Sequence, residues 1–224
     1  MREFDLLSIY PNLKSRFISK NTRTIENRIV ASYREKEFYD GKRDNGYGGF
    51  FYDGRWKPIA EKIFSEYKLK DNSKILHIGC DKGFLLHDIK NLKPKSIVRG
   101  IEISNYAISK SKKDIKKYIK KSPFNNLPFK SNYFDFVIAI GPAYALNLRD
   151  SIQCIKEIAR VGKGKSFITL GSYDDESEEK LFKYWTLLGS TILHKKEWVK
   201  VLKHCRYKGD YKFNTAKSLN LKFK

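Results

Sequence analysis

The feature that most constrains the fold is a regular alternation that begins at Lys74 in the chain of 224 residues. Short apolar, mostly β-branched runs alternate with longer amphipathic stretches, a pattern typical of βαβ units in a parallel sheet covered by helices on both faces. We therefore expect a doubly wound α/β fold with about seven mostly parallel strands. The first predicted strands are Lys74–Ile78, Ser96–Glu102, Phe134–Ile140 and Lys165–Leu170.

The stretches between these strands predict the helices. An apolar stripe with lysines on the other faces predicts a single helix over Asn105–Lys120. Residues 1–58 suggest one or two helices and then an aromatic, glycine-rich loop, so we divide the chain into an N-terminal extension, 1–58, and a main domain, 59–224. Further helices are predicted at Phe84–Asn91, Asp150–Val161, Glu176–Gly189 and His194–Cys205, with a closing antiparallel strand at Gly209–Phe213.

Composition narrows the class of protein. Three widely spaced cysteines without a C-x-x-C pair argue against a disulfide framework and a zinc site, so we expect no metal. The first residues lack the apolar core of a signal peptide, and no stretch reaches the roughly 18 apolar residues of a membrane span, so we expect a cytoplasmic protein. The net charge of +21 would suit a nucleic-acid partner, but its lysines are spread along the whole chain, and we do not favour that partner.

A turn after the first predicted strand is the main candidate site. Gly79 and Gly83 lie in this turn, where glycines let the backbone approach a nucleotide-like ligand closely. Glu102 ends the second strand roughly 20 residues later, where an acid can accept hydrogen bonds from ribose hydroxyls. A tight βα turn alone could also explain the glycines, but the combined spacing predicts an adenosine site.

The segment Leu76–Phe84 resembles the glycine-rich first motif of class I S-adenosylmethionine-dependent methyltransferases. Later segments resemble further parts of this family in the same order, which makes the likeness more specific than one motif. Gly100–Ser104 is similar to the ribose-binding strand of the family. The family has a signature that leads into its fourth strand, and it is similar to Asn126–Phe129 together with Asn132–Ile138. The helix that precedes the fifth strand of the family is similar to Glu157–Val161.

This resemblance covers roughly residues 56–172 and implies a Rossmann-like fold, an enzyme, and S-adenosylmethionine as the cofactor. Within the family, the chain resembles the type 11-like methyltransferases. The residues that the resemblance implies for cofactor binding are His77, Gly79, Cys80, Asp81, Gly83, Phe84, Glu102, Ile103, Asn126, Leu127 and Ile140.

Two residues depart from the first motif of the family. His77 stands where an acid is usual, and Asp81 stands where the middle glycine is usual. The acid of the family helps to orient the methionine ammonium, and Asp81 could supply a carboxylate for this purpose instead. A degenerate member that only binds a nucleotide or a partner protein therefore stays an alternative.

The stretch Asn45–Trp56 is the second unusual segment. It resembles an N-terminal Gly-Tyr-Gly-Gly…Tyr-Asp-Gly-Arg-Trp segment in a subgroup of bacterial methyltransferases, some of them near surface-polysaccharide genes. Its aromatic residues Tyr47, Tyr52 and Trp56 offer stacking faces, and Arg55 is a bidentate donor for a carboxylate or phosphate. We expect a lid over cofactor or substrate, with a structural flap as the alternative.

The acceptor is expected at the end of the strand Phe134–Ile140, where the family that the chain resembles holds it. Tyr144 could orient or deprotonate an acceptor, or it could merely pack; His194 and His204 are weaker candidates for a base. We expect methyl transfer to a small molecule, with a sugar or another metabolite as candidates. An RNA or protein acceptor recruited by the positive charge is the alternative, and the oligomeric state is left open.

Overall fold

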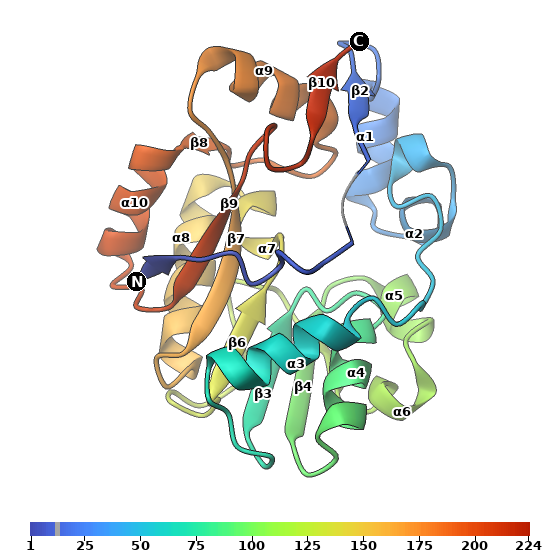
Figure 1. The fold of residues 1–224 in the computed structure, drawn as a ribbon. Helices are drawn as coiled ribbons and strands as arrows, with labels where there is room; N and C mark the ends of the chain where they lie inside the picture. The colour runs from blue at the N-terminus through green and yellow to red at the C-terminus, as the bar shows by residue number, and fades with distance from the viewer. Residues whose placement is uncertain (12–13) are drawn as a thin grey trace.

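The computed structural model describes residues 1–11 and 14–224. Seven parallel strands form the central sheet in the order β1-β9-β7-β6-β3-β4-β5, and a short β8 pairs with β7 beside this path (Figure 1). The predicted Rossmann-like, doubly wound fold is therefore confirmed. The strands are β1 Arg2–Glu3, β3 Lys74–Ile78, β4 Ile97–Glu102, β5 Ile119–Lys121, β6 Phe136–Ala139, β7 Ser166–Tyr173, β8 Leu193–His194 and β9 Asp210–Asn214.

Helices cover both faces of the sheet and close one apolar core on each (Figure 1). On one face, α8 (Leu148–Val161) and α10 (Lys195–His204) contribute to a core that includes Ile155 and Trp198. On the other, α3 (Lys57–Glu66) and α4 (Phe84–Leu92) contribute Ile63 and Leu86. The two cores fix the strand ends on which the site is built.

The prediction of one helix over Asn105–Lys120 is wrong. The segment forms α5 (Asn105–Ser109), α6 (Lys113–Lys116) and the edge strand β5. The hydroxyls of Ser109 and Ser111 donate to the carbonyls of Tyr106 and Ile108 at 2.8 Å, and such local side-chain bonds compete with helix continuation. Ile119 then pairs with Gly100 of β4, so tertiary pairing overrides the helical pattern.

Two predictions for the C-terminal part also need correction. The strand predicted at Gly209–Phe213 exists as β9, but it runs parallel to β7 and β1 rather than antiparallel. The helix predicted over Glu176–Gly189 is α9 (Glu176–Trp185) and ends four residues earlier than expected. The residues after Trp185 instead form part of a cavity wall.

The N-terminal segment packs against the carboxyl end of the sheet. β2 (Arg16–Ile18) pairs with β10 (Leu221–Phe223), and α1 (Ile25–Ser32), α2 (Lys36–Asp40) and the 3-10 turn η1 (Arg43–Asn45) follow (Figure 1). A capping box of Thr24 and Asn27 starts α1. Phe38 and Tyr39 of α2 pack with Ala107 of α5. Within the described ranges, no helix is long and apolar enough to cross a membrane.

Candidate active site

A cleft at the carboxyl end of β3 contains two adjoining cavities, the first of about 540 Å³ and the second of about 680 Å³. Gly79, Asp81 and Ile140 line both cavities, so the two meet over the turn after β3. The first extends to Tyr144 in α7 (Pro142–Ala145), and the second extends to His77. Both volumes are typical of small-molecule sites, and the cleft can hold two ligands side by side.

Gly79 is required by the geometry of this turn. Its φ is +67°, and an added Cβ would lie 2.5 Å from Cγ of Pro142. No other residue type fits this position, and the missing side chain leaves the backbone bare where the cavities meet. Gly83, the N-cap of α4, also has a positive φ, +75°, and its Cβ would lie 2.9 Å from Cγ2 of Ile115. It lines neither cavity, so it serves the turn and its packing rather than a ligand.

Asp81 brings a carboxylate into the cleft. The hydroxyls of Tyr39 and Tyr47 donate to it at 3.0 and 3.2 Å. Burial and the nearby charge of Glu102 raise the pKa of Asp81 to about 7. The group therefore changes charge near neutral pH and is suited to receive a cationic ligand, which would favour its ionised form.

Glu102 stabilises the turn after β3 and lies beneath the cavity surface. Its fully buried carboxylate accepts hydrogen bonds from the backbone N–H groups of Asp81, Ile103 and Ser104 at 2.9, 2.7 and 2.9 Å. The side chain lines neither cavity. A carboxylate has about four acceptor sites, so one stays available, and the ribose role of Glu102 stays a prediction.

His77 lies in the wall of the second cavity with only 5% of its surface exposed. Neither ring nitrogen has a hydrogen-bond partner among the described residues. Burial lowers the pKa of His77 to about 3, so the ring is neutral at physiological pH. A buried polar side chain without a partner indicates that a polar ligand completes the site.

The other residues that the resemblance implies for the cofactor lie outside both cavities: Cys80, Phe84, Ile103, Asn126 and Leu127. Cys80 packs under β4, where a Cβ on Gly100 would lie 2.6 Å from its Sγ. The backbone N–H of Leu127 donates to Glu157 at 2.8 Å. In this region Phe124 lines the first cavity instead. The resemblance places an adenine-contacting acid of the family around Pro123 and Phe124, but Asn126 was predicted as its substitute because Phe124 has no polar group.

The glycine-rich aromatic segment contributes to the cleft in part. Tyr47 lines both cavities, Arg55 the first and Trp56 the second. Tyr52 lies outside the cleft, because its hydroxyl donates to Asp88 at 2.5 Å and its ring packs against α4. Three of the four predicted lid residues therefore reach the cavities.

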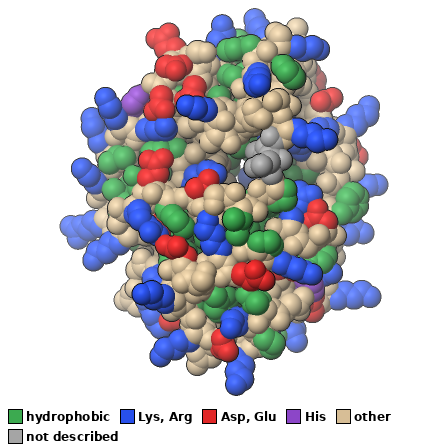
Figure 2. All heavy atoms as spheres, in the orientation of Figure 1, with side chains coloured by type: hydrophobic (Ala, Val, Ile, Leu, Met, Phe, Trp, Pro, Cys, Tyr) green, Lys and Arg blue, Asp and Glu red, His purple; other side chains and the backbone are tan. Residues whose placement is uncertain are grey.

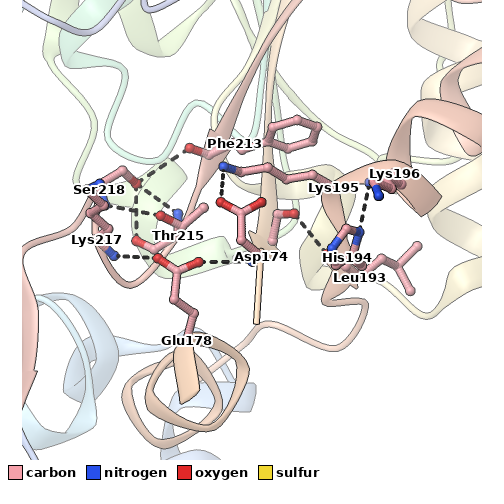
Figure 3. A network of polar contacts seen from close by, with 11 residues as sticks. Asp174, Glu178, Leu193, His194, Lys195, Lys196, Phe213, Thr215, Lys217 and Ser218 are labelled. Atoms are coloured by element: carbon pink, nitrogen blue, oxygen red, sulfur yellow. Dashed lines mark hydrogen bonds and ion pairs between the residues drawn. The ribbon is translucent and has the colours of Figure 1, made fainter. Parts of the chain in front are cut away.

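Tyr144 lines the first cavity. Burial raises the pKa of its phenol, so the hydroxyl stays protonated at neutral pH and can orient an acceptor but is a poor base. His194 lies outside the cavities and caps α10, accepting from the backbone N–H of Lys196 at 3.1 Å (Figure 3). His204, at the end of α10, also lies outside them.

Five arginines line the first cavity: Arg16, Arg23, Arg34, Arg43 and Arg55. Of these, only Arg55 was predicted from the sequence, and the other four were missed. A compositional signal existed, because six of the eleven arginines of this lysine-rich chain lie between residues 16 and 55, where only three lysines occur. That signal does not reveal that the side chains converge, because they come from separate strands, turns and loops.

Together, the fold and the cleft define an α/β enzyme with a nucleotide-compatible turn and room for a second ligand. The sequence model of the methyltransferase domain family matches residues 69–209, more than half of the chain, so the chain belongs to this family. It is a methyltransferase, and S-adenosylmethionine is its cofactor. The glycine cradle at Gly79 and the unpartnered His77 fit a bound cofactor of this kind.

Solved structures agree on the fold. YcgJ from Bacillus subtilis matches with a TM-score of 0.53 at 14% identity, over 65% of this chain and 66% of that one. An S-adenosylmethionine-dependent methyltransferase from Methanosarcina mazei matches with a TM-score of 0.51 at 20% identity, over 64% of this chain and 83% of that one. No curated protein matches the sequence. At these identities the likeness concerns the fold alone.

Proposed function

We propose that the protein transfers a methyl group from S-adenosylmethionine to a small molecule bound in the first cavity. The main support is the arrangement of the two cavities, which share Gly79 and Asp81 in their walls. His77 belongs to the second cavity alone and Tyr144 to the first alone. The methionine end of the donor would face His77 and Asp81, and the acceptor would approach from the side of Tyr144.

In this proposal the chain aligns two ligands and excludes water. Asp81 in its ionised form attracts the methionine ammonium, and neutral His77 offers one hydrogen-bond donor and one acceptor. The cofactor supplies a methyl group activated by the adjacent sulfonium, which an acceptor atom can attack in line. Tyr47 and Phe50 line both cavities and would limit solvent access over the reacting atoms. Tyr144 would orient the acceptor through its protonated phenol.

A small acceptor is favoured over RNA or protein. On the face seen in Figure 2, lysines and arginines are scattered among acidic and apolar side chains rather than gathered into one basic patch. The likeness of Asn45–Trp56 to a subgroup with links to surface polysaccharides supports a sugar-like acceptor, by analogy alone.

Calorimetric titration of the full chain with S-adenosylmethionine at pH 8 tests the proposal. We expect one cofactor to bind per chain and His77→Leu to weaken binding without loss of stability, because the substitution removes a buried group without a partner. His87→Leu is the matched control, since His87 pairs with Asp114 outside the cleft. Absence of both heat and thermal stabilisation at millimolar cofactor would refute the donor site.

A further inference from the structure

The first cavity has a cationic end built from three separate segments. Arg16 belongs to β2, Arg23 precedes α1 and Arg43 belongs to η1. The guanidinium groups of Arg16 and Arg23 lie 5.7 and 5.4 Å from the ring centre of Trp185, which lines the same cavity. Trp185 thus helps to hold two of the positive charges at the cavity wall.

Among the described residues, no ion pair involves Arg16, Arg23, Arg34 or Arg43, whereas Arg55 pairs with Asp53. The acidic groups that act on these arginines, Asp44 on Arg23 and Asp81 on Arg34, do so without a contact at ion-pair distance. Arg23 donates to the backbone carbonyl of Trp185, and Arg43 donates to the carbonyls of Gly46 and Tyr47 at 2.9 Å. Backbone carbonyls fix the direction of a guanidinium but do not neutralise its charge.

The positive groups repel one another. Burial and the charges of Arg43 and Arg16 lower the pKa of Arg23 to about 10, and burial and Arg43 also lower the pKa of Arg16. The one acidic residue in the described wall of the first cavity is Asp81, at its junction with the second. Arg16 and Arg23 are half-buried and Arg43 is exposed at the cavity wall. Like charges that converge without a counter-ion in contact destabilise the fold, so this convergence indicates an anionic ligand.

The cofactor alone would leave the charge of these arginines unbalanced. S-adenosylmethionine carries a sulfonium, an ammonium and one carboxylate, so its net charge is positive and adds to the charge of the cleft. A single carboxylate on the acceptor would also leave most of the arginine charge unbalanced. A phosphate group carries about two negative charges at neutral pH and offers oxygens that match the fork of guanidinium donors.

We infer that the methyl acceptor is a small molecule with a phosphate or diphosphate group, which Arg16, Arg23 and Arg43 bind at the wall of the first cavity. This inference rests on the proposed function, because it assigns the first cavity to the acceptor. The phosphate positions the acceptor, and its remaining part extends past Tyr144 toward the turn at Gly79. Arg34, which interacts electrostatically with Asp81 and Tyr144, lines the same cavity.

The test uses pyrophosphate and inorganic phosphate as probes in a chloride buffer, with binding followed by calorimetry and thermal shift. We expect pyrophosphate to bind the wild-type chain and the double variant Arg16→Gln/Arg43→Gln to bind it about tenfold or more weakly, since charge-assisted hydrogen bonds are lost. Tighter binding of pyrophosphate than of phosphate indicates a diphosphate, and the reverse indicates a monophosphate. Without ligand, the double variant should melt at or above the wild-type temperature, because like charges have been removed.

Arg28→Gln is the matched control, because Arg28 lies in the same segment and donates to the carbonyl of Lys183 but lines neither cavity. The inference is overturned if the control loses as much affinity as the double variant, or if the double variant binds pyrophosphate as tightly as wild type. It is also overturned if a short oligoribonucleotide binds more tightly and displaces pyrophosphate. A parallel titration with S-adenosylmethionine separates the two proposals: its failure refutes the donor site and leaves the anion result standing.

Discussion

The two sides of the cleft hold their charges in opposite ways. The charged groups of the main domain have partners from the N-terminal segment: the buried ammonium of Lys82, which lines neither cavity, lies 2.7 Å from the carboxylate of Asp40, and Asp81 accepts from the hydroxyls of Tyr39 and Tyr47. The arginines from Arg16 to Arg43 form no ion pair within the described part of the chain. A paired charge stabilises the folded chain, whereas an unpaired one near a cavity is suited to a ligand. The comparison assigns cofactor binding to the domain and acceptor selection to the N-terminal segment.

The largest effect should follow from a change to the domain side. Gly79→Ala places a methyl group 2.5 Å from Pro142 in a backbone with positive φ, where the two cavities meet. We expect methyl transfer to fall roughly 100-fold or more, because the ligands are displaced from alignment. Gly164→Ala is the control: its φ is +106° and nothing lies within 4 Å of an added Cβ, so it shares the backbone strain but not the clash. Equal losses of activity in both variants would contradict this assignment.

The next effect concerns the charge of Asp81. Its pKa of about 7 means that at pH 6 roughly one tenth of the groups are ionised, against nine tenths at pH 8. Because the ionised form attracts the ammonium of the cofactor, affinity should rise about tenfold between these two pH values. Calorimetry across this range should find the rise in wild type and a flat, weak profile in Asp81→Asn. An identical pH dependence in the variant would remove Asp81 from the binding site.

A smaller effect is expected for Tyr144→Phe. Burial keeps its phenol protonated, so the substitution removes an orienting hydroxyl and not a base. Activity should fall less than about tenfold and the pH profile should keep its shape, whereas loss of a general base costs roughly 100-fold or more. Steady-state rates from pH 6 to 9 measure both. A larger fall together with loss of the rise in rate toward high pH would make Tyr144 the base.

The smallest effect is expected for Tyr52→Phe in the aromatic segment. Its hydroxyl donates to Asp88 away from both cavities, so the loss should lower the free energy of unfolding by about 1 kcal/mol and leave cofactor affinity unchanged. Denaturant unfolding and calorimetry check the two parts. Weaker cofactor binding by this variant would mean that Tyr52 also contributes to the ligand site.

Most of the domain could be predicted from the sequence, because its buried strands are continuous runs of apolar residues. β3 was predicted with its observed bounds, Lys74–Ile78, and the turn at Gly79 was identified from its motif. The direction of β9 was not predicted correctly, because a local pattern does not specify whether a strand pairs parallel or antiparallel. β1 and β2 were missed since two or three residues are too few to show alternation.

The N-terminal wall could not be predicted for a different reason. The resemblance to the methyltransferase domain begins near residue 56, and the separate resemblance of Asn45–Trp56 includes only Arg55 of the arginines in this wall. Arg16 reaches the cavity because β2 pairs with β10 at the other end of the chain, and Arg23 because a loop sets it beside Trp185. Such contacts depend on long-range pairing that no local spacing encodes. The sequence did predict Tyr47, Arg55, Trp56 and Tyr144 for the site, and they line the cavities. The other residues of the N-terminal wall, such as Arg16 and Arg23, required the three-dimensional arrangement.

The central claim is that a cationic cofactor and an anionic acceptor bind at the same time in adjoining cavities. The most direct measurement is the affinity of pyrophosphate for the full chain, alone, with saturating S-adenosylmethionine and with saturating S-adenosylhomocysteine, which lacks the sulfonium charge. The account predicts that S-adenosylmethionine tightens pyrophosphate binding several-fold, and more than S-adenosylhomocysteine does, because opposite charges then share one cleft. Mutual exclusion of pyrophosphate and S-adenosylmethionine would mean that the arginines serve the cofactor itself, and would contradict the account.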